Sequence, residues 1–226
     1  LAAVLEALLA SCAQIASKVR TASCDSTSCF SPIMGDEEEG EMAVDVLANE
    51  LLVSNLRATK LVSVISSESD GIEDSIPDAQ SGFSVALDPL SGNSILDTNF
   101  AVGTMFSVWR GNSLQNVTGG ELAAAGACVY GPRTTWTVAL RELPAVHEFL
   151  LVEEASAAGG RWAKSNAFAA MREGRLFAPA NYRSSATHEG YARLIEHWQR
   201  EEFSLRYTGA AVVDVVQLLV KGCGVF

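Results

Sequence analysis

The spacing of hydrophobic residues changes several times along this chain, and this change limits the folds that it can adopt. Steps of three and four residues, typical of amphipathic helices, run through 1–20, 41–56, 188–200 and 210–221. Between the second and third of these segments lie β-rich runs at 61–66, 83–88, 102–109, 134–140 and 148–152. Because a helix buries a stripe and a strand buries a face, this mixture favours a layered α/β or α+β fold over a helical bundle.

Residues 121–127 are rich in alanine, the residue with the highest helix propensity, so we expect a further helix there. The sequence contains no internal repeat and no long flexible linker. At 226 residues, the chain is long enough to bury a core without a disulfide scaffold. We therefore expect residues 1–226 to form a single region.

The charge balance and the cysteines exclude several classes of protein. The chain has 27 acidic and 16 basic residues, a formal net charge of -11, which disfavours binding to nucleic acid. Its longest apolar stretch, 1–15, is interrupted by Glu6, Ser11 and Gln14, so we expect no membrane-spanning helix and no membrane insertion. Five scattered cysteines, an odd number, argue against a secreted disulfide framework and a zinc ribbon, and favour a reducing compartment.

Several longer stretches carry more specific information. They are KVRTASC, AVDVLANELL, FSVALDPLSGNSILDTNFAVGTMFSVW, VTGGELAAAGACVYGPRTTW, HEFLL and LRYTGAAVVDVVQ. Through them, and over nearly its whole length, the chain resembles the sedoheptulose-1,7-bisphosphatases of the sugar-bisphosphatase superfamily. The resemblance implies the layered α+β sugar-phosphatase fold. The family's fold closes with further strands and a helix at its C-terminal end, and since this sequence ends at Phe226, we expect it to lack that closing segment.

Enzymes of this family are implied to release the terminal phosphate of a sugar bisphosphate with Mg²⁺, which polarises the phosphoryl group and activates the attacking water. The family's DPLDGSS loop supplies two aspartates and a backbone carbonyl to the metals. The loop here reads DPLSGNS, which keeps Asp88 and the Leu90 carbonyl but places Ser91 at the second aspartate. The family's SEE segment is matched by SES, which keeps Glu68 and places Ser69 at the catalytic carboxylate.

A third acid, Asp45 in AVDVLANELL, matches an acid of the family motif, and the next acid falls at Asn49 or Glu50. Glu50 is therefore a candidate catalytic residue. The family's last metal glutamate belongs to the segment expected beyond the end of this sequence. Since serine hydroxyls cannot offset a divalent charge as carboxylates do, we expect Mg²⁺ to be bound weakly or not at all. Without the resemblance, such isolated acids are ordinary surface charges.

The residues implied to bind the sugar phosphate are better kept. They are Gly92, Asn93 and Ser94 of the DPLSGNS loop, Asn181 and Arg183 in FAPANYR, and Arg206 and Tyr207 in LRYTG. Arginine suits phosphate because its guanidinium is permanently charged and can donate two parallel hydrogen bonds. In relatives this arginine reaches across a dimer interface, which implies a homo-oligomer or a larger assembly. The alternative is a surface Arg206 paired with Glu201 or Glu202.

Cys24 and Cys29 match the paired cysteines of the plastid enzyme, a pair implied to be reduced by thioredoxin. Without that resemblance, two unpaired thiols are the simpler interpretation. Cys12, Cys128 and Cys223 have apolar neighbours in the sequence and are expected to be core thiols. The sequence begins at Leu1 rather than Met, so we expect an upstream segment, such as a cleaved targeting peptide. The resemblance implies the chloroplast stroma; without it, the cytoplasm is expected.

Two main functions are compatible with these residues. The first is a sedoheptulose-bisphosphatase-like pseudoenzyme, catalytically impaired at Ser69 and Ser91, with a binding or structural role in an assembly. The second is an active, Mg²⁺-dependent sugar bisphosphatase of the Calvin cycle, a phosphoric monoester hydrolase of carbohydrate metabolism. A regulatory protein that senses sugar phosphate is a third alternative. We expect the first.

Overall fold

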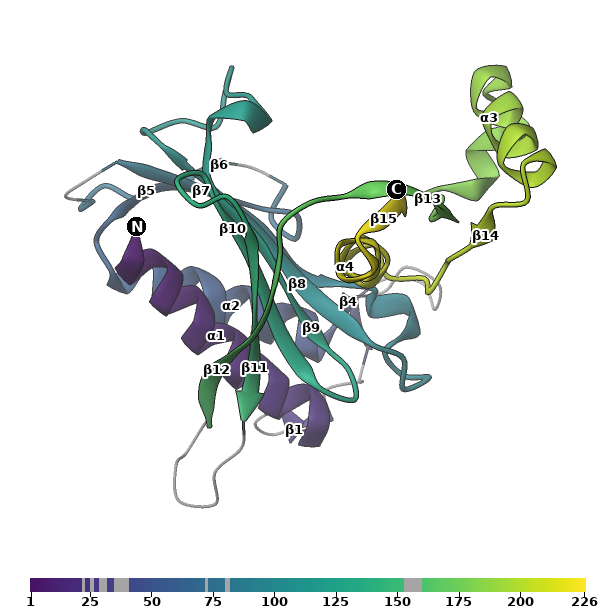
Figure 1. Ribbon diagram of the computed structural model, residues 1–226. Coiled ribbons are helices and arrows are strands. Elements are labelled where there is room, and N and C mark those ends of the chain that lie inside the picture. Colours follow the sequence, from purple (N-terminus) through teal and green to yellow (C-terminus); the bar gives the residue numbers. More distant parts are fainter. Residues whose placement is uncertain are drawn as a thin grey trace.

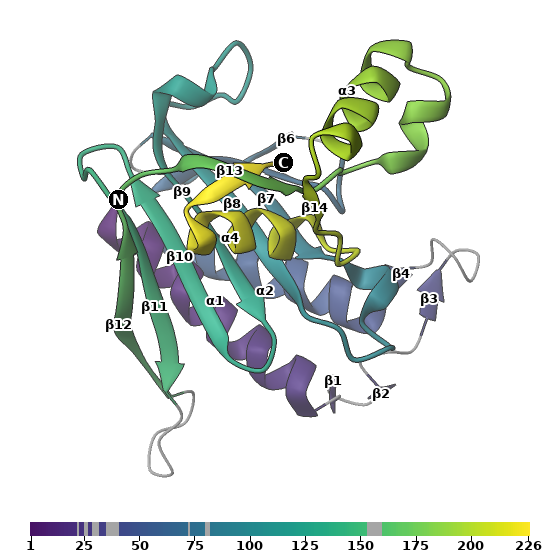
Figure 2. The ribbon, with the colours of Figure 1, turned by 45° about the vertical axis from the view of Figure 1, so that its right-hand side comes forward.

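The computed structural model describes residues 1–21, 23–24, 27–28, 32–34, 41–71, 73–79, 82–152 and 160–226. Its helices and sheets are stacked in layers (Figure 1). Two long helices lie against one face of a large sheet, and a third helix lies against the opposite face (Figure 2). The helices are α1 (Ala2–Thr21), α2 (Ala43–Ala58), α3 (Glu189–Arg200) and α4 (Ala211–Lys221). The layered α+β fold predicted from the sequence is confirmed.

The large sheet has eight strands in the order β12-β11-β10-β9-β8-β7-β5-β6. Adjacent strands of this sheet are antiparallel, except for β5 and β7, which are parallel. Its strands are β5 (Val62–Ser67), β6 (Glu73–Ser75), β7 (Phe83–Ser91), β8 (Val102–Arg110), β9 (Leu122–Tyr130), β10 (Thr134–Leu140), β11 (Val146–Val152) and β12 (Arg161–Phe168).

Smaller elements complete the described chain. A three-stranded parallel sheet has the order β14-β13-β15. Its strands are β13 (Arg172–Phe177), β14 (Ser204–Leu205) and β15 (Cys223–Val225). Two short antiparallel pairs are β1 (Ser23–Cys24) with β2 (Thr27–Ser28), and β3 (Pro32–Met34) with β4 (Glu41–Met42). The 3₁₀ turns are η1 (Asn93–Ile95), η2 (Gly119–Glu121) and η3 (Tyr182–Ala186).

The two long helices bury the stripes that their sequence spacing predicts. In α2, every fourth residue from Val44 to Leu56 is completely buried: Val44, Ala48, Leu52 and Leu56. Helix α1 buries Val4, Leu8, Cys12 and Ile15 in the same way. Both stripes join one core cluster with the inner face of the large sheet. At about 1.5–3 kcal/mol for each large aliphatic side chain, this burial fixes the helix pair on the sheet.

Helix α1 is also the one described helix that is long and apolar enough to cross a membrane, judged by length and composition alone. The three polar interruptions at Glu6, Ser11 and Gln14 do not lower the average hydropathy of the helix below that of a spanning segment. A core helix passes the same test, and a stripe of α1 is buried against the sheet and α2. The expectation of no membrane insertion therefore stays a prediction.

The helix predicted at residues 121–127 is wrong. Glu121 ends the turn η2, and the residues after it belong to β9, which lies between β8 and β10 in the large sheet. Small residues are needed there because a Cβ at Gly126 would approach the Phe106 ring to 2.5 Å. The ring of Phe106, on β8, stacks on the ring of Trp136, on β10, across the intervening β9, with centroids 5.5 Å apart. Packing between strands thus overrides the helix propensity of alanine.

The C-terminal part of the chain covers the other face of the sheet. Helix α4 buries Val212 and Val216, which pack with Ala127 of β9. The small parallel sheet follows, and α3 packs on it through Phe177 and Trp198, whose ring centroids are 4.8 Å apart. Strands β12 and β13 were not predicted, because β12 is mostly exposed and lacks a regular alternation of apolar residues.

Candidate functional site

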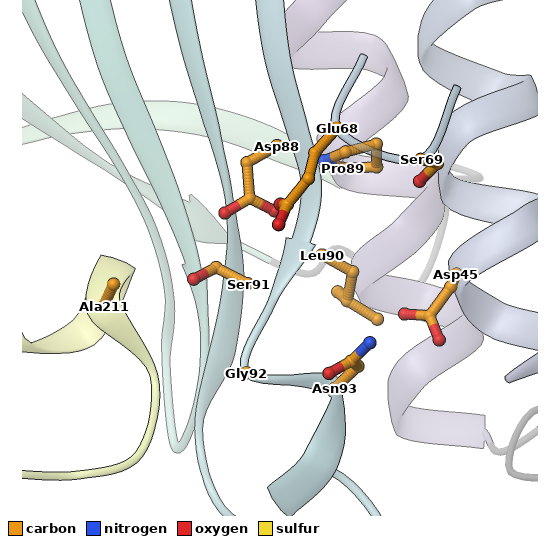
Figure 3. Close-up of a pocket in the computed structure, with 10 residues that line it drawn as sticks. All are labelled: Asp45, Glu68, Ser69, Asp88, Pro89, Leu90, Ser91, Gly92, Asn93 and Ala211. Atoms are coloured by element: carbon orange, nitrogen blue, oxygen red, sulfur yellow. The ribbon is translucent and has the colours of Figure 1, made fainter. Parts of the chain in front are cut away.

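A cavity of about 440 Å³ opens where the ends of β5 and β7 meet the first turns of α2 and α4. Figure 3 shows its lining residues. They are Asp45, Glu68, Ser69, Asp88, Pro89, Leu90, Ser91, Gly92, Asn93 and Ala211. The structure therefore gathers, from three separate segments, the metal-side residues that the sequence singled out.

The parallel pairing of β5 with β7 explains why two carboxylates meet. Ser67, the last residue of β5, is the register partner of Leu87, so Glu68 just after β5 and Asp88 within β7 lie side by side. The backbone N–H of Glu68 donates to the carbonyl of Leu87 at 3.0 Å and extends the ladder. In Figure 3 the two carboxylates point toward each other. Glu68 itself is exposed, whereas Asp88 is partly buried.

A β-bulge in β7 shapes the rest of the loop. The register with β8 pairs Asp88 with Met105 and Ser91 with Gly103. Two residues of β7, Pro89 and Leu90, therefore lie opposite one residue of β8, Thr104. In a regular strand Asp88 and Ser91 would point to opposite faces, but the extra residue brings them to the same side. The Ser91 hydroxyl hydrogen-bonds the Asp88 carboxylate as a result.

Burial raises the pKa of Asp88 from its ordinary 3.8 to about 7, and the neighbouring charge of Glu68 adds to the rise. The hydrogen bond from Ser91 acts in the opposite direction and is too weak to cancel these effects. Two carboxylates that face each other in a partly dry site disfavour each other's ionisation. A cation placed between them would remove this cost.

Asp45 occupies a different part of the cavity. Its side chain is 5% exposed, and its Oδ2 accepts the backbone N–H of Met42 at 2.7 Å, at the start of α2. In Figure 3 it is drawn apart from the Glu68 and Asp88 carboxylates, with Leu90 between them in the view. Glu50 lies further along α2, is exposed and does not line the cavity. The structure gives no support to Glu50 as a catalytic residue.

The residues expected to bind phosphate lie in two places. Gly92 and Asn93 line the cavity, whereas Ser94 is exposed in η1 and does not. Asn181 and Arg183 are exposed at η3. None of these residues is shown here to contact a ligand, so their roles stay predictions.

Arg206 and Tyr207 lie in the segment that leads from β14 into α4. The backbone N–H of Arg206 donates to the Phe177 carbonyl at 2.8 Å, and its guanidinium donates to the Leu205 carbonyl at 3.0 Å. Tyr207 is 59% exposed. The next residue of the segment, Thr208, donates its N–H to both oxygens of the buried Asp214, at 3.1 and 3.3 Å. Asp214 was not recognised in the sequence, because nothing local distinguishes it from a solvated helix acid.

One glycine joins the two parts of the site. Gly92 has φ +92°, which favours glycine, and a Cβ there would approach the Ala210 Cβ to 2.5 Å. Ala210 precedes α4 and is 1% exposed. The DPLSGNS loop and the segment after Arg206 are therefore in direct contact at this point.

The sequence matches the description "Fructose-1-6-bisphosphatase, N-terminal domain" over residues 1–164 and "Fructose-1-6-bisphosphatase, C-terminal domain" over residues 170–226. The chain belongs to the fructose-1,6-bisphosphatase family. It is 44% identical to a chloroplastic sedoheptulose-1,7-bisphosphatase of Triticum aestivum, over 94% of this chain and 52% of that protein. It is 34% identical to a class 1 fructose-1,6-bisphosphatase of Syntrophotalea carbinolica, over 83% of this chain and 57% of that protein. The chain thus spans about half the length of the curated relatives it matches.

Solved structures agree with this assignment. A crystal structure of a putative sedoheptulose-1,7-bisphosphatase from Toxoplasma gondii superposes with a TM-score of 0.80 and 29% identity, covering 96% of this chain and 70% of that one. The holo form of Leishmania major fructose-1,6-bisphosphatase has a TM-score of 0.79 at 20% identity, which shows a shared fold. The resemblance stated from the sequence motifs is confirmed at the level of the superfamily.

The cavity can be tested for the Mg²⁺ that the resemblance implies. Among the residues that the structure describes, no three His, Cys, Asp or Glu side chains gather closely enough to hold a metal. The Glu68 and Asp88 pair does fit one hydrated Mg²⁺, which commonly binds through one or two carboxylates and keeps several waters. Ser69 and Ser91 add only neutral hydroxyls, and Asp45, the other described carboxylate that lines the cavity, is drawn apart from this pair in Figure 3.

The cysteines that the structure describes differ in their burial. Cys12 and Cys128 are completely buried, as expected, whereas Cys223 is only partly buried on β15, so the prediction of a core thiol there is wrong. Cys29 and the side chain of Cys24 lie outside the described residues. Their pairing stays a prediction.

Proposed function

We propose that this chain is a sugar-phosphate-binding member of the bisphosphatase family with impaired hydrolytic activity, because its metal centre is reduced to one weak site. The observation that carries the proposal is the composition of the cavity. Glu68 and Asp88 face each other, while the two positions beside them in the cavity, Ser69 and Ser91, are neutral. A bound Mg²⁺ would polarise a phosphoryl group and activate water.

Asp88 and Arg206 would then have separate roles in binding. Asp88, with a pKa of about 7, is half protonated near neutral pH, so protons compete with any cation for this carboxylate. The phosphate distant from the metal would be held by Arg206, whose charge needs no metal to bind an anion. Binding can therefore persist where turnover is slow.

Assembly and location follow the relatives. We propose a homo-oligomer, because exposed Leu205 and Tyr207, 52% and 59% accessible, flank Arg206 on the surface. Exposed apolar side chains beside a binding residue suit an interface between copies. We also propose the chloroplast, with reversible pairing of Cys24 and Cys29 as a redox control, because the relatives from Triticum aestivum, Spinacia oleracea and Chlamydomonas reinhardtii carry chloroplastic names.

The test compares binding with turnover in the purified chain. Calorimetric titration with sedoheptulose 1,7-bisphosphate should show binding, and Mg²⁺-dependent phosphate release should be at least about a hundredfold slower than for the Triticum aestivum relative. Fructose 1,6-bisphosphate is the second substrate to try. Turnover within about tenfold of that relative would overturn the impaired-enzyme proposal. No binding at millimolar ligand would remove the sugar-phosphate proposal as well.

The alternative is an active, Mg²⁺-dependent sugar bisphosphatase of the Calvin cycle. One observation favours it: the bulge of β7 brings Ser91 to the same side as Asp88, beside Glu68, so the cavity still has a carboxylate pair that could hold one cation. The same turnover measurement separates the two functions.

A further inference from the structure

The bulge at Pro89 and Leu90 cannot be held by the backbone ladder alone. Proline has no N–H to donate, and the extra residue of a bulge has no partner on the neighbouring strand. The Pro89 carbonyl is instead satisfied by a side chain. The Thr104 hydroxyl, on the strand directly opposite the bulge, donates to this carbonyl at 2.8 Å in a fully buried contact.

A second buried hydroxyl supports the first. The hydroxyl oxygens of Tyr130, on β9, and Thr104 are 2.7 Å apart. The single hydrogen of Thr104 is used on Pro89, whose carbonyl cannot donate, so Tyr130 must donate to Thr104. Burial raises the pKa of the Tyr130 hydroxyl well above the ordinary value, and the neighbouring buried thiols of Cys12 and Cys128 add to the rise. The tyrosine therefore stays protonated and able to donate.

We propose that Thr104 and Tyr130 form a relay of positioning residues that holds the bulge of β7 and thereby keeps residue 91 on the same side as Asp88. A strand without the bulge would place residue 91 on the opposite face, because side chains alternate with a period of two. The relay thus decides whether a ligand at position 91 can act together with Asp88. Its consequence for metal binding rests on the proposed function; its effect on the loop does not.

The relay lies entirely outside the cavity, so its effect is separable from direct metal contact. Thr104 is 0% and Tyr130 4% exposed, and neither lines the cavity. Buried hydrogen bonds in series strengthen one another, and an unpaired buried hydroxyl or carbonyl is costly. Loss of one hydroxyl should therefore loosen the loop rather than shift a ligand.

Thr104→Val removes the hydroxyl while keeping the shape of the side chain, and Thr104→Ser restores the hydroxyl. The matched control is Thr137→Val, since Thr137 is also buried in the large sheet and its hydroxyl has no hydrogen-bond partner within the described structure. Tyr130→Phe tests the second step of the relay. Each variant is made with Ser91 and with Ser91→Asp, and circular dichroism with thermal unfolding checks that it folds.

Two measurements are made on each protein: calorimetric titration with Mg²⁺ alone, and amide hydrogen exchange over residues 90–93. We expect Ser91→Asp to strengthen Mg²⁺ binding about tenfold and Thr104→Val to abolish that gain. Exchange over 90–93 should accelerate at least about tenfold in Thr104→Val, less in Tyr130→Phe, and not in Thr104→Ser or Thr137→Val.

The outcomes separate the two proposals. Unchanged exchange in Thr104→Val, or exchange that accelerates equally in the Thr137→Val control, overturns the relay. A full Mg²⁺ gain in the Thr104→Val background overturns it too. If Ser91→Asp gives no gain in any background, the metal part of the proposed function fails, and the exchange rates alone decide the relay. If Thr104→Val does not fold, Tyr130→Phe takes its place, and exchange over 90–93 no faster than in Thr137→Val then overturns the relay.

Discussion

The two parts of the candidate site differ in how their side chains are placed. The metal side has a rigid frame, because Glu68 and Asp88 extend from paired strands and the bulge is held by buried hydrogen bonds. Its Ser69 and Ser91 side chains carry no charge. On the side proposed to bind phosphate, Arg206 is partly buried between the exposed Leu205 and Tyr207, in a segment held largely by backbone hydrogen bonds.

The two sides therefore depend on different features of the molecule. The position of residue 91 depends on the register of the sheet, which many other residues fix, so a change of its side chain leaves the frame intact. The guanidinium of Arg206 contacts the Leu205 carbonyl of its own chain, and the proposed phosphate contact depends on this one side chain. Substitutions on the two sides should therefore have separate effects.

The largest effect should come from Asp88→Asn on the metal side. The folded pKa of Asp88, about 7, lies above its ordinary 3.8, so the folded state binds the proton more tightly. The contribution of Asp88 to the free energy of unfolding is therefore complete below about pH 4 and is lost as the pH rises through 7. Asparagine does not titrate, so the free energy of unfolding of Asp88→Asn should lack this decrease, which is at most about 4 kcal/mol between pH 4 and 8 in wild type.

Urea unfolding without Mg²⁺, at pH 4, 6 and 8, measures this difference, with Asp97→Asn as the control for loss of an exposed acid in the neighbouring turn. A difference between Asp88→Asn and wild type that does not change with pH would show that Asp88 is an ordinary carboxylate. Added Mg²⁺ should in turn bind more tightly as the pH rises through 7, because protons leave the same group.

On the phosphate side, Arg206→Ala should weaken sugar-phosphate binding by about 1.5–3 kcal/mol, the range for hydrogen bonds to charged groups. Calorimetric titration with sedoheptulose 1,7-bisphosphate measures the change. Arg200→Ala is the matched control, because Arg200 lies on α3 with 72% of its side chain exposed and pairs with Glu201. Equal effects of the two substitutions would mean that Arg206 contributes only general positive charge.

Gly92→Ala tests the contact between the two sides. The substitution should destabilise the protein by about 2–3 kcal/mol, from the left-handed backbone and the clash with Ala210. Gly71→Ala is its control, since Gly71 has φ +64° but nothing within 4 Å of an added Cβ, and should cost only about 1 kcal/mol. Chemical unfolding gives both values, and equal losses would mean that the loop and Ala210 separate easily.

The smallest effect is expected from Ser91→Asp, which restores an anion beside Asp88. Mg²⁺ binding should strengthen about tenfold, or about 1.4 kcal/mol, because a carboxylate is a harder ligand than a hydroxyl. Phosphate release should rise little, since Ser69 still lacks the second charge. Ser113→Asp, an acid added to an exposed loop, controls for general attraction of the ion. A wild-type chain that already binds Mg²⁺ tightly would show that Ser91 is an adequate ligand.

The sequence predicted well those elements whose periodicity reflects burial of one face. The helices α1 and α2 and the strands β7 and β8 were found within three residues of their bounds, because each carries a regular apolar pattern. It failed at β9, where alanine and glycine are required by close packing between strands, and at the exposed β12. Neither the close packing at β9 nor the exposure of β12 can be read from the propensities of the local residues.

For the site, the sequence by itself determined the residue types: which acids are kept, which are serine, and the family to which the motifs belong. Only the tertiary structure decided how they combine. The pairing of Glu68 with Asp88 comes from the parallel register of β5 and β7, and the placement of Ser91 from a bulge opposite Thr104. Such relations join residues far apart in the chain, and they depend on sheet register and burial, which no local stretch of sequence specifies.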